Sequence, residues 1–251
     1  MNNNNTLLKA AGLPSFARIQ KKDMYPAIKH VIDENKKIIK KIENLKNLTW
    51  NNFVYILEES DDKISKVWAP IRHLNSVMND PKIRSQYEKS LKLLTSHYSK
   101  IGQNKKLFFQ YERYFIENKK KLNPHQIKLI SDTLIGFKLS GVHLGAKERK
   151  LFRDCQEKLA NFESKFEQNI LDSTNAWTKN FKTKNSLSGL PNNALEIASE
   201  VASSRGQTGY TLTLDQPSYM AIMMFANNQQ LRKTFYLAYM SRASNKFPIS
   251  S

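Results

Sequence analysis

The longest pattern of apolar and polar positions in this chain runs from 147 to 181. Its apolar residues recur at steps of three and four, which keeps them on one face of a helix. They are Phe152, Cys155, Leu159, Phe162, Phe166, Ile170 and Trp177, and the opposite face is rich in Lys, Arg and Glu. The pattern predicts one long helix whose apolar stripe is buried against other helices. We interpret it as a packing element without chemistry of its own.

Amphipathic stretches on the N-terminal side predict further helices over about 23–42, 49–74, 79–102, 108–115 and 123–140. Most begin at a capping signal, and these signals are Asp23, Thr49, Asn79-Asp80-Pro81 and Asn123-Pro124. Pro70 predicts a kink or a short break in the second helix, because proline lacks the N–H donor that a helix needs. Residues 1–16 are expected to be a loosely held arm, since Pro14 disfavours helix there.

The period changes after 176. Alternating residues over 178–183 and 209–214 predict two strands that pair as a small β ribbon. Helices are expected over 191–203 and 217–226, and a last one from Asn228 to Met240. The final two are apolar nearly all round, which is typical of helices buried on several sides, so part of their surface is expected to be exposed and prone to association if no further part of the fold covers it. The fold class is therefore mainly α, a bundle of long helices with a minor two-stranded ribbon.

The composition fits a globular helical protein of 251 residues, with 40% apolar and 25% charged residues. The single cysteine, Cys155, excludes an internal disulfide and suits a reducing compartment. The N-terminus has no signal-peptide pattern, and no window approaches the roughly 18 apolar residues of a membrane span. We therefore expect a cytoplasmic protein that does not enter a membrane.

The formal charge of +18 is compatible with an anionic partner, either a nucleic acid or a membrane surface. However, 31 of the basic residues are Lys and only 9 are Arg, whereas phosphate and base recognition favours Arg. The chain also contains 24 Asn, and A/T-rich codons encode both Lys and Asn. Codon bias therefore explains the charge without a partner, and nucleic-acid binding is the less favoured interpretation.

The residues alone predict no active site. The five histidines are His30, His73, His97, His125 and His143, and none belongs to an H-E-x-x-H zinc motif. The adjacent acidic residues Glu58-Glu59 and Asp61-Asp62 are interpreted as a solvated patch. We assign no catalytic residue and no metal ligand, and the substrate-binding residues are unknown from the sequence.

Several separated strings resemble, in the same order, the N-terminal helical region of oligopeptidase A and the related thimet oligopeptidases. They are LTWNNF at 48–53, WAPIRHLNSV at 68–77, FKLSG at 137–141, QNILDST at 168–174, WTK at 177–179, GYTLTLD at 209–215, PSY at 217–219 and YMSRAS at 239–244. The similarity extends over about 13–245, and an ordered agreement of this kind is more specific than one motif.

The resemblance implies a cytoplasmic zinc metalloendopeptidase that degrades short peptides in a deep channel between helical halves. In that family an H-E-x-x-H helix and a downstream Glu bind the zinc, and the metal activates the attacking water. None of these residues is present in this sequence, so no zinc ligand is transferred to it. The resemblance also implies that 1–251 is a single N-terminal helical region of a larger peptidase fold. Its expected parts are the arm at 1–16, a helical bundle at 23–176, the ribbon and terminal helices at 177–245 and a divergent tail at 246–251.

Three hypotheses follow. The first is an N-terminal fragment that forms one wall of the peptide channel and is inactive alone, truncated before the zinc motif or completed by a separately encoded catalytic half. The second is a non-catalytic helical module that binds peptides or proteins. The third is a basic binder of nucleic acids or membrane surfaces, for which affinity would fall steeply with salt.

Overall fold

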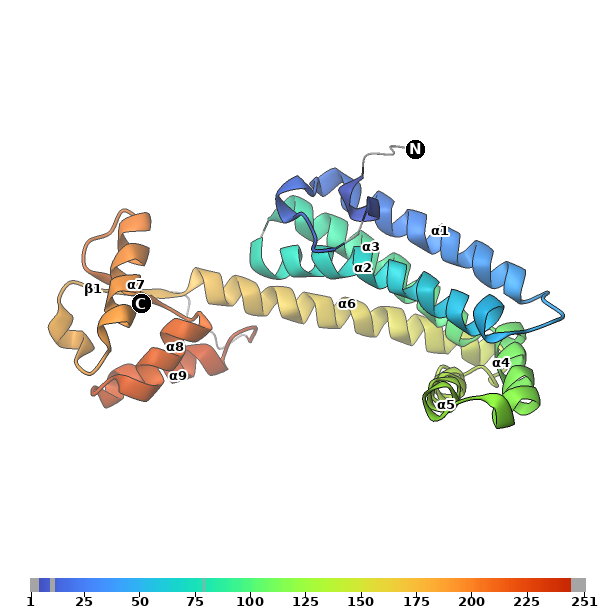
Figure 1. Ribbon diagram of the computed structural model, residues 1–251. Helices are drawn as coiled ribbons and strands as arrows, with labels where there is room; N and C mark the ends of the chain where they lie inside the picture. The colour runs from blue at the N-terminus through green and yellow to red at the C-terminus, as the bar shows by residue number, and fades with distance from the viewer. Residues whose placement is uncertain (1–4, 10–11, 79, 245–251) are drawn as a thin grey trace. The chain divides into compact units, whose positions relative to one another are not determined.

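A computed structural model describes residues 5–9, 12–78 and 80–244 (Figure 1). Within them the α-helices are α1 (Met24–Ile42), α2 (Tyr55–Met78), α3 (Pro81–Gly102), α4 (Lys105–Asn118), α5 (Pro124–Leu139), α6 (Ala146–Ala176), α7 (Asn192–Ser204), α8 (Gln216–Phe225) and α9 (Gln229–Met240). The strands are β1 (Thr178–Phe181) and β2 (Tyr210–Thr213). The mainly α fold with a small ribbon is confirmed.

The chain divides into two compact units, Met1–Phe162 and Glu163–Ser251, with the boundary inside α6. The sequence pattern instead changes near 177, where α6 gives way to β1. The interpretation of 1–251 as one region of a larger fold stays a prediction. Its tail at 246–251 lies outside the described residues.

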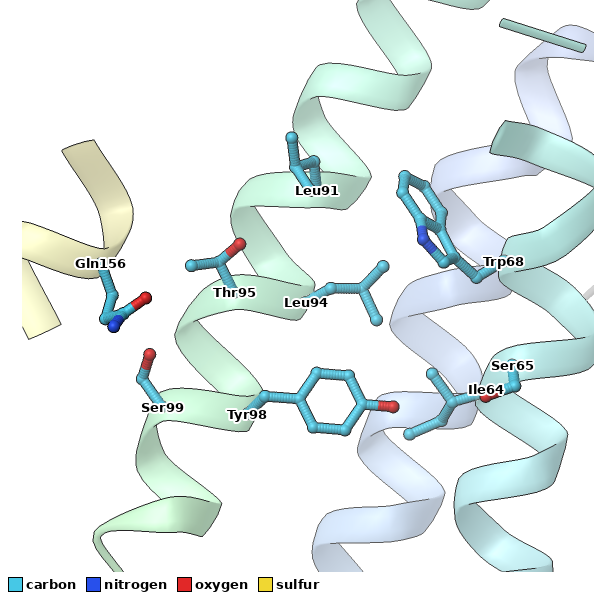
Figure 2. Close-up of a pocket in the computed structure, with 9 residues that line it drawn as sticks. All are labelled: Ile64, Ser65, Trp68, Leu91, Leu94, Thr95, Tyr98, Ser99 and Gln156. Atoms are coloured by element: carbon cyan, nitrogen blue, oxygen red, sulfur yellow. The ribbon is translucent and has the colours of Figure 1, made fainter. Parts of the chain in front are cut away.

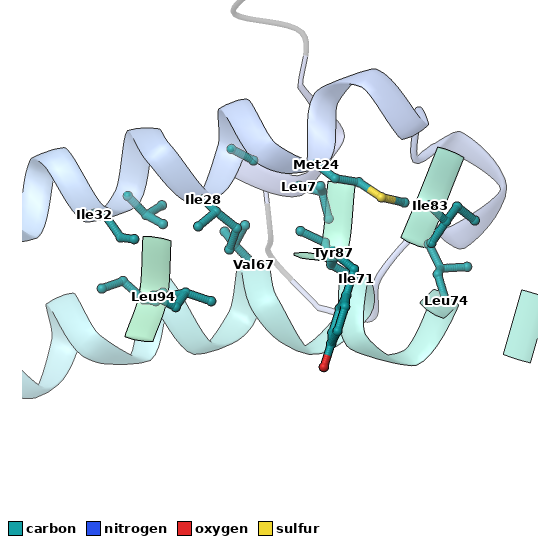
Figure 3. Packing of buried hydrophobic residues seen from close by; sticks show 13 residues of the cluster. Leu7, Met24, Ile28, Ile32, Val67, Ile71, Leu74, Ile83, Tyr87 and Leu94 are labelled. Carbon is teal, nitrogen blue, oxygen red and sulfur yellow. The ribbon is translucent and has the colours of Figure 1, made fainter. Parts of the chain in front are cut away.

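Helices α1, α2 and α3 form the first core of the N-terminal unit (Figure 3). Each contributes one apolar face at the spacing that the sequence predicts. The largest contributors are Met24, Ile28 and Ile32 of α1, Ile64, Val67 and Ile71 of α2, and Ile83, Tyr87 and Leu94 of α3. Burying a large apolar side chain contributes roughly 1.5–3 kcal/mol, so this shared face is the main stabilising element of the three helices.

Part of the predicted arm packs onto this core. Leu7 is buried, and the Asn5 side chain donates a hydrogen bond to the Asp23 carbonyl oxygen at 2.9 Å. The Asn5 amide oxygen also accepts a bond from the Leu7 backbone N–H at 3.1 Å. These contacts hold residues 5–9 beside the start of α1.

Two sequence predictions concern α2, one about the cap that precedes it and one about the proline inside it. Thr49 is the N-cap, as predicted, and forms a reciprocal capping box with Asn52, which the sequence reading did not include. The first turns, Trp50–Val54, are π-helical. Pro70 lies inside α2 and does not break it, so the predicted short break is wrong. Pro70 and Ile71 are buried, and this packing keeps the helix continuous past the missing N–H donor.

A second core in the same unit is rich in aromatic residues and joins the start of α2 to α4 and α5. The Phe53 ring lies 4.5 Å from Tyr111 and 5.5 Å from Tyr114, measured between centroids. Gln110 of α4 donates to the carbonyl oxygens of residues 42, 43 and 45, which satisfies acceptors left at the C-terminal end of α1.

The long helix is present, but its apolar stripe is not buried as predicted. α6 ends at Ala176 and β1 follows, so the helical spacing read as far as 181 stops at the predicted change of period, and the strand expected over 178–183 begins there. The stripe is largely exposed: Leu159 is 50% exposed, Phe162 70% and Phe166 57%, and Cys155 is exposed as well. The expectation of a buried stripe is therefore wrong, because no described part of the chain covers these positions. The pattern shows that the face is apolar but does not specify what covers it.

The C-terminal unit is built around Trp177 and Phe235, whose rings meet edge to face with centroids 4.7 Å apart. Strands β1 and β2 pair antiparallel, with Thr178 opposite Thr213 and Phe181 opposite Tyr210. Helix α7 packs on β2, and α8 packs on α9. The ribbon and its following helices thus match the sequence prediction closely.

The end of α9 is tied to the last turns of α6 within this unit. Arg242 lies over the Tyr239 ring at 3.5 Å and donates a hydrogen bond to Thr174 at 2.9 Å. Tyr239 stacks in turn on Tyr219 of α8, with centroids 3.8 Å apart. These contacts link α6, α8 and α9. The four residues that make them lie in the sequence strings that resemble the family.

A buried polar group crosses the first core. Asn35 donates to the Ser60 hydroxyl at 2.9 Å, and its amide oxygen lies 3.0 Å from His97 Nε2. With its nitrogen used by Ser60, Asn35 presents an acceptor, so the neutral His97 ring donates from Nε2. Burial, assisted by the positive charges of Lys36 and Lys100, lowers the pKa of His97 to about 4.

This lowered pKa predicts a stability loss in mild acid. The folded state keeps His97 neutral while the unfolded chain takes up a proton below about 6.5, so stability falls as the pH drops from 6.5 toward 4. We expect a loss of about 2 kcal/mol between pH 7.5 and pH 5. Urea titrations at both values should show this loss, and His97→Gln should remove most of it. His125→Gln, at an exposed position on α5, is the control; an identical pH dependence in both variants would contradict the assignment.

Gly189 predicts a strong packing constraint in the C-terminal unit. Its φ is +94°, and a Cβ there would lie 2.1 Å from the Phe225 carbonyl oxygen. Gly189→Ala should therefore lower the free energy of unfolding by about 3 kcal/mol. Gly206→Ala is the matched control, since Gly206 has φ +67° but a Cβ added there would meet no atom within 4 Å, and it should cost only about 1 kcal/mol. Urea unfolding followed by the fluorescence of buried Trp177 measures both, and equal costs would refute the clash.

Candidate functional site

The five histidines lie in separate surroundings. Two pack against phenylalanine rings, His73 on Phe16 at 5.3 Å and His143 on Phe108 at 5.2 Å. His30 faces Glu34 at 3.3 Å along α1, His97 is buried beside Asn35, and His125 is exposed in the first turn of α5. Within 5–9, 12–78 and 80–244, no three His, Cys, Asp or Glu side chains gather where they could hold a metal ion. These residues do not fit the zinc that the resemblance implies for the family, and we derive no metal-dependent step from them.

The acidic residues of α2 are used in ordinary surface contacts. Asp62 pairs with Lys66 one turn later at 2.5 Å, and Asp61 accepts a hydrogen bond from the Tyr98 hydroxyl at 2.7 Å. Partial burial and the nearby charge of Asp61 raise the pKa of Glu58. Of these carboxylates, Asp61 links α2 to α3 through the Tyr98 hydroxyl, and Asp62 is paired within α2.

A cavity of about 330 Å³ lies where α2, α3 and α6 meet in the N-terminal unit (Figure 2). Its lining residues are Ile64, Ser65, Trp68, Leu91, Leu94, Thr95, Tyr98, Ser99 and Gln156. Figure 2 shows Thr95 and Ser99 pointing toward Gln156, while Leu94 and Tyr98 point toward α2. The cavity thus has an apolar side and a polar side, and no charged residue lines it.

The walls of this cavity are held in place by contacts behind them. The Trp68 ring stacks on Tyr87, with centroids 4.9 Å apart and planes 17° from parallel. The hydroxyl of Tyr98 is fixed by Asp61. Several lining residues lie on helix faces that the sequence predicts to be apolar, but the sequence does not identify them as a site, because the hollow is lined by residues of three separate helices.

A second hollow, of about 510 Å³, lies between the N-terminal segment and α2. It is lined by Gly12, Pro14, Phe16, Lys66, Ala69, Pro70 and His73. Its walls include the contact between the Phe16 and His73 rings. His73 and Pro70 both line this hollow. Among its lining residues the other titratable group is the ammonium of Lys66, and no carboxylate is present to act with His73 in acid–base chemistry.

The terminal helices expose a broad apolar surface. The exposed fractions on α8 are 43% for Met220, 65% for Met224 and 47% for Phe225, and on α9 they are 45% for Tyr236, 55% for Leu237 and 63% for Met240. Ile222 and Phe235 are buried on the inner sides of the same helices. Within the described chain each of these helices buries one face and leaves the other exposed, as the sequence predicts for a chain without the rest of the larger fold. Exposed apolar surface of this kind marks an interaction site or a tendency to associate.

Residues 28–150 match the family model of the neurolysin/thimet oligopeptidase N-terminal domain. The chain is 34% identical to oligopeptidase A of Haemophilus influenzae over 251 residues, which is 99% of this chain and 37% of that protein. It is 32% identical to oligopeptidase A of Escherichia coli, covering 97% of this chain and 36% of the relative. A probable cytosolic oligopeptidase A of Arabidopsis thaliana is 28% identical over 96% of this chain.

The chain belongs to the family of oligopeptidase A and thimet oligopeptidase, as the ordered strings had indicated. It spans a little over a third of the length of the curated relatives that it matches. In the described part of the chain, no helix combines the length and apolar character needed to cross a membrane.

The exposed surface of α8 and α9 predicts self-association of the isolated chain. Replacing Met224 and Leu237 together by Gln should reduce it, because both side chains are more than half exposed and Gln removes apolar surface without adding charge. Sedimentation velocity over a range of protein concentrations measures the effect. Leu139→Gln, at a 76% exposed position in the other unit, is the control. Unchanged association in the double variant would show that this surface is not responsible.

Proposed function

We propose that this chain is the N-terminal part of a zinc-dependent oligopeptidase that degrades short peptides. It forms one wall of the peptide channel, and hydrolysis requires a catalytic part whose residues are not in this sequence. The observation that carries the proposal is the continuous match to oligopeptidase A of H. influenzae over 251 residues. The match to the N-terminal domain model supports the same position in the fold.

The exposed apolar surfaces support an interaction with a catalytic part. Helices α8 and α9 each present one uncovered apolar face, and the α6 stripe is more than half exposed at Phe162 and Phe166. Covering exposed apolar surface removes it from water, which is favourable, and such surface marks interaction sites. A separately encoded catalytic half would supply the cover in a split enzyme, and both parts would act in the cytoplasm.

The test is reconstitution with the part of H. influenzae oligopeptidase A that this chain does not match. We expect the mixture to cleave a fluorogenic short peptide and each component alone to be inactive, because the channel and the zinc site are then both complete. A chelator should abolish the cleavage, and added zinc should restore it. The same assay with bovine serum albumin in place of this chain controls for nonspecific stabilisation. If the two parts form a stable complex without peptidase activity, the proposal is wrong.

A peptide-binding module without turnover is a second candidate. It is favoured by the uncharged cavity between α2, α3 and α6, which could bind a peptide without any catalytic group. Binding of peptides by this chain alone, with no cleavage after reconstitution, would support this alternative.

A further inference from the structure

Three polar side chains in the cavity of the N-terminal unit have no hydrogen-bond partner within the described chain. They are Thr95 and Ser99 of α3 and Gln156 of α6, all of them half-buried. Figure 2 shows them directed at one another across the polar side of the cavity. Half-buried hydroxyl and amide groups are normally satisfied by protein, water or a ligand. This side of the cavity therefore offers both donors and acceptors to a bound molecule.

The opposite side is apolar and preformed. Ile64 and Leu94 are buried, and Trp68 is held by its stack on Tyr87. A rigid aromatic wall binds an apolar group with little loss of conformational freedom. The volume of about 330 Å³ is at the small end of the roughly 300–1,000 Å³ of ligand sites, which suits one large side chain with its flanking backbone.

The absence of charge in the lining separates this cavity from the surface around it. The N-terminal unit carries 31 Lys and Arg against 16 Asp and Glu, yet none of the nine lining residues is ionisable at neutral pH. An anionic ligand would gain no direct ion pair in the cavity, and a cationic one would be repelled by the surrounding net charge. The lining fits a neutral ligand with an apolar body and an amide edge.

We propose that this cavity binds one large aliphatic or aromatic side chain of a peptide, with Gln156, Ser99 and Thr95 bonding to the adjoining backbone amides. The choice of a peptide as ligand rests on the proposed function, whereas the preference for a neutral apolar residue rests on the cavity itself. The site lies on the α2–α3–α6 face and selects among peptides by the residue placed against Trp68. Glutamine and hydroxyl side chains match peptide groups because they both donate and accept.

The test uses short capped peptides and the full chain. The indole N–H signals of the three tryptophans are followed by nuclear magnetic resonance, and the Trp68 signal is assigned with Trp68→Phe. Ac-Ala-Leu-Ala-NH2 should shift the Trp68 signal with a dissociation constant on the order of 1 mM, as expected for one side chain and a few hydrogen bonds. Ac-Ala-Asp-Ala-NH2 should produce no saturable shift, and Trp50 and Trp177 should not respond to either peptide.

Two variants test the polar and the apolar side separately. Gln156→Ala should weaken binding of the leucine peptide about five-fold, while the matched variant Asn161→Ala, exposed on the same helix, should not. Ser99→Phe should abolish binding by filling the cavity, with Ser96→Phe on the same helix as its control. Circular dichroism measures whether each variant is folded. If Ser99→Phe does not fold, the comparison of Gln156→Ala with Asn161→Ala tests the site by itself.

The outcomes separate this inference from the proposed function. Equal shifts with leucine and aspartate peptides, or unchanged affinity in Gln156→Ala, would overturn the site. If the site fails while the reconstituted enzyme still cleaves peptides, only this inference is wrong. If the leucine peptide binds as expected but reconstitution gives no cleavage, the site stands and the peptidase assignment fails.

Discussion

The shared apolar face of α1, α2 and α3 is the contact on which the N-terminal unit depends. Met24, Ile28 and Ile32 of α1 are all completely buried against the other two helices. This packing aligns α2 with α3, keeps α2 helical through Pro70 and places the buried pair of Asn35 and His97 between α1 and α3. The cavity lined by Trp68 and Leu94 lies beside the same core, so its shape follows from how these helices pack.

The C-terminal unit has its own constraint. Trp177 follows α6 directly and packs on Phe235 of α9, so the end of the long helix, the β ribbon and the last helix share one core. Arg242 and Tyr239 add a second connection to Thr174 of α6. Each unit thus has its own buried core, while apolar residues of α6, α8 and α9 remain exposed. Exposed apolar surface of this kind marks an interaction site or a tendency to associate.

The described residues contain no group of side chains that could hold a metal ion, and this is compatible with the family to which the chain belongs. The chain matches a little over a third of its relatives' length, and a fold can be retained where a site is completed by other residues. What the structure shows is a helical framework with exposed apolar surfaces on α6, α8 and α9 and an uncharged cavity between α2, α3 and α6. The strong positive charge needs no separate role in this view, since the cavity and the exposed apolar surfaces are formed by uncharged side chains.

The sequence by itself determined the helices, most of their caps and the ribbon, because these depend on local spacing and on residues close in the chain. The cap at Thr49, the start of α5 at Pro124 and the pairing of β1 with β2 all followed from such signals, whereas Asp23 precedes α1 without a side-chain capping hydrogen bond. The tertiary structure alone decided which apolar faces are covered. The stripe through Phe162 and the outer side of α9 have the same periodicity as buried faces, yet they are exposed. Hydrophobic periodicity records that a face avoids water, whereas burial requires a second surface of matching shape, and the cavity beside Trp68 likewise depends on where three helices separate.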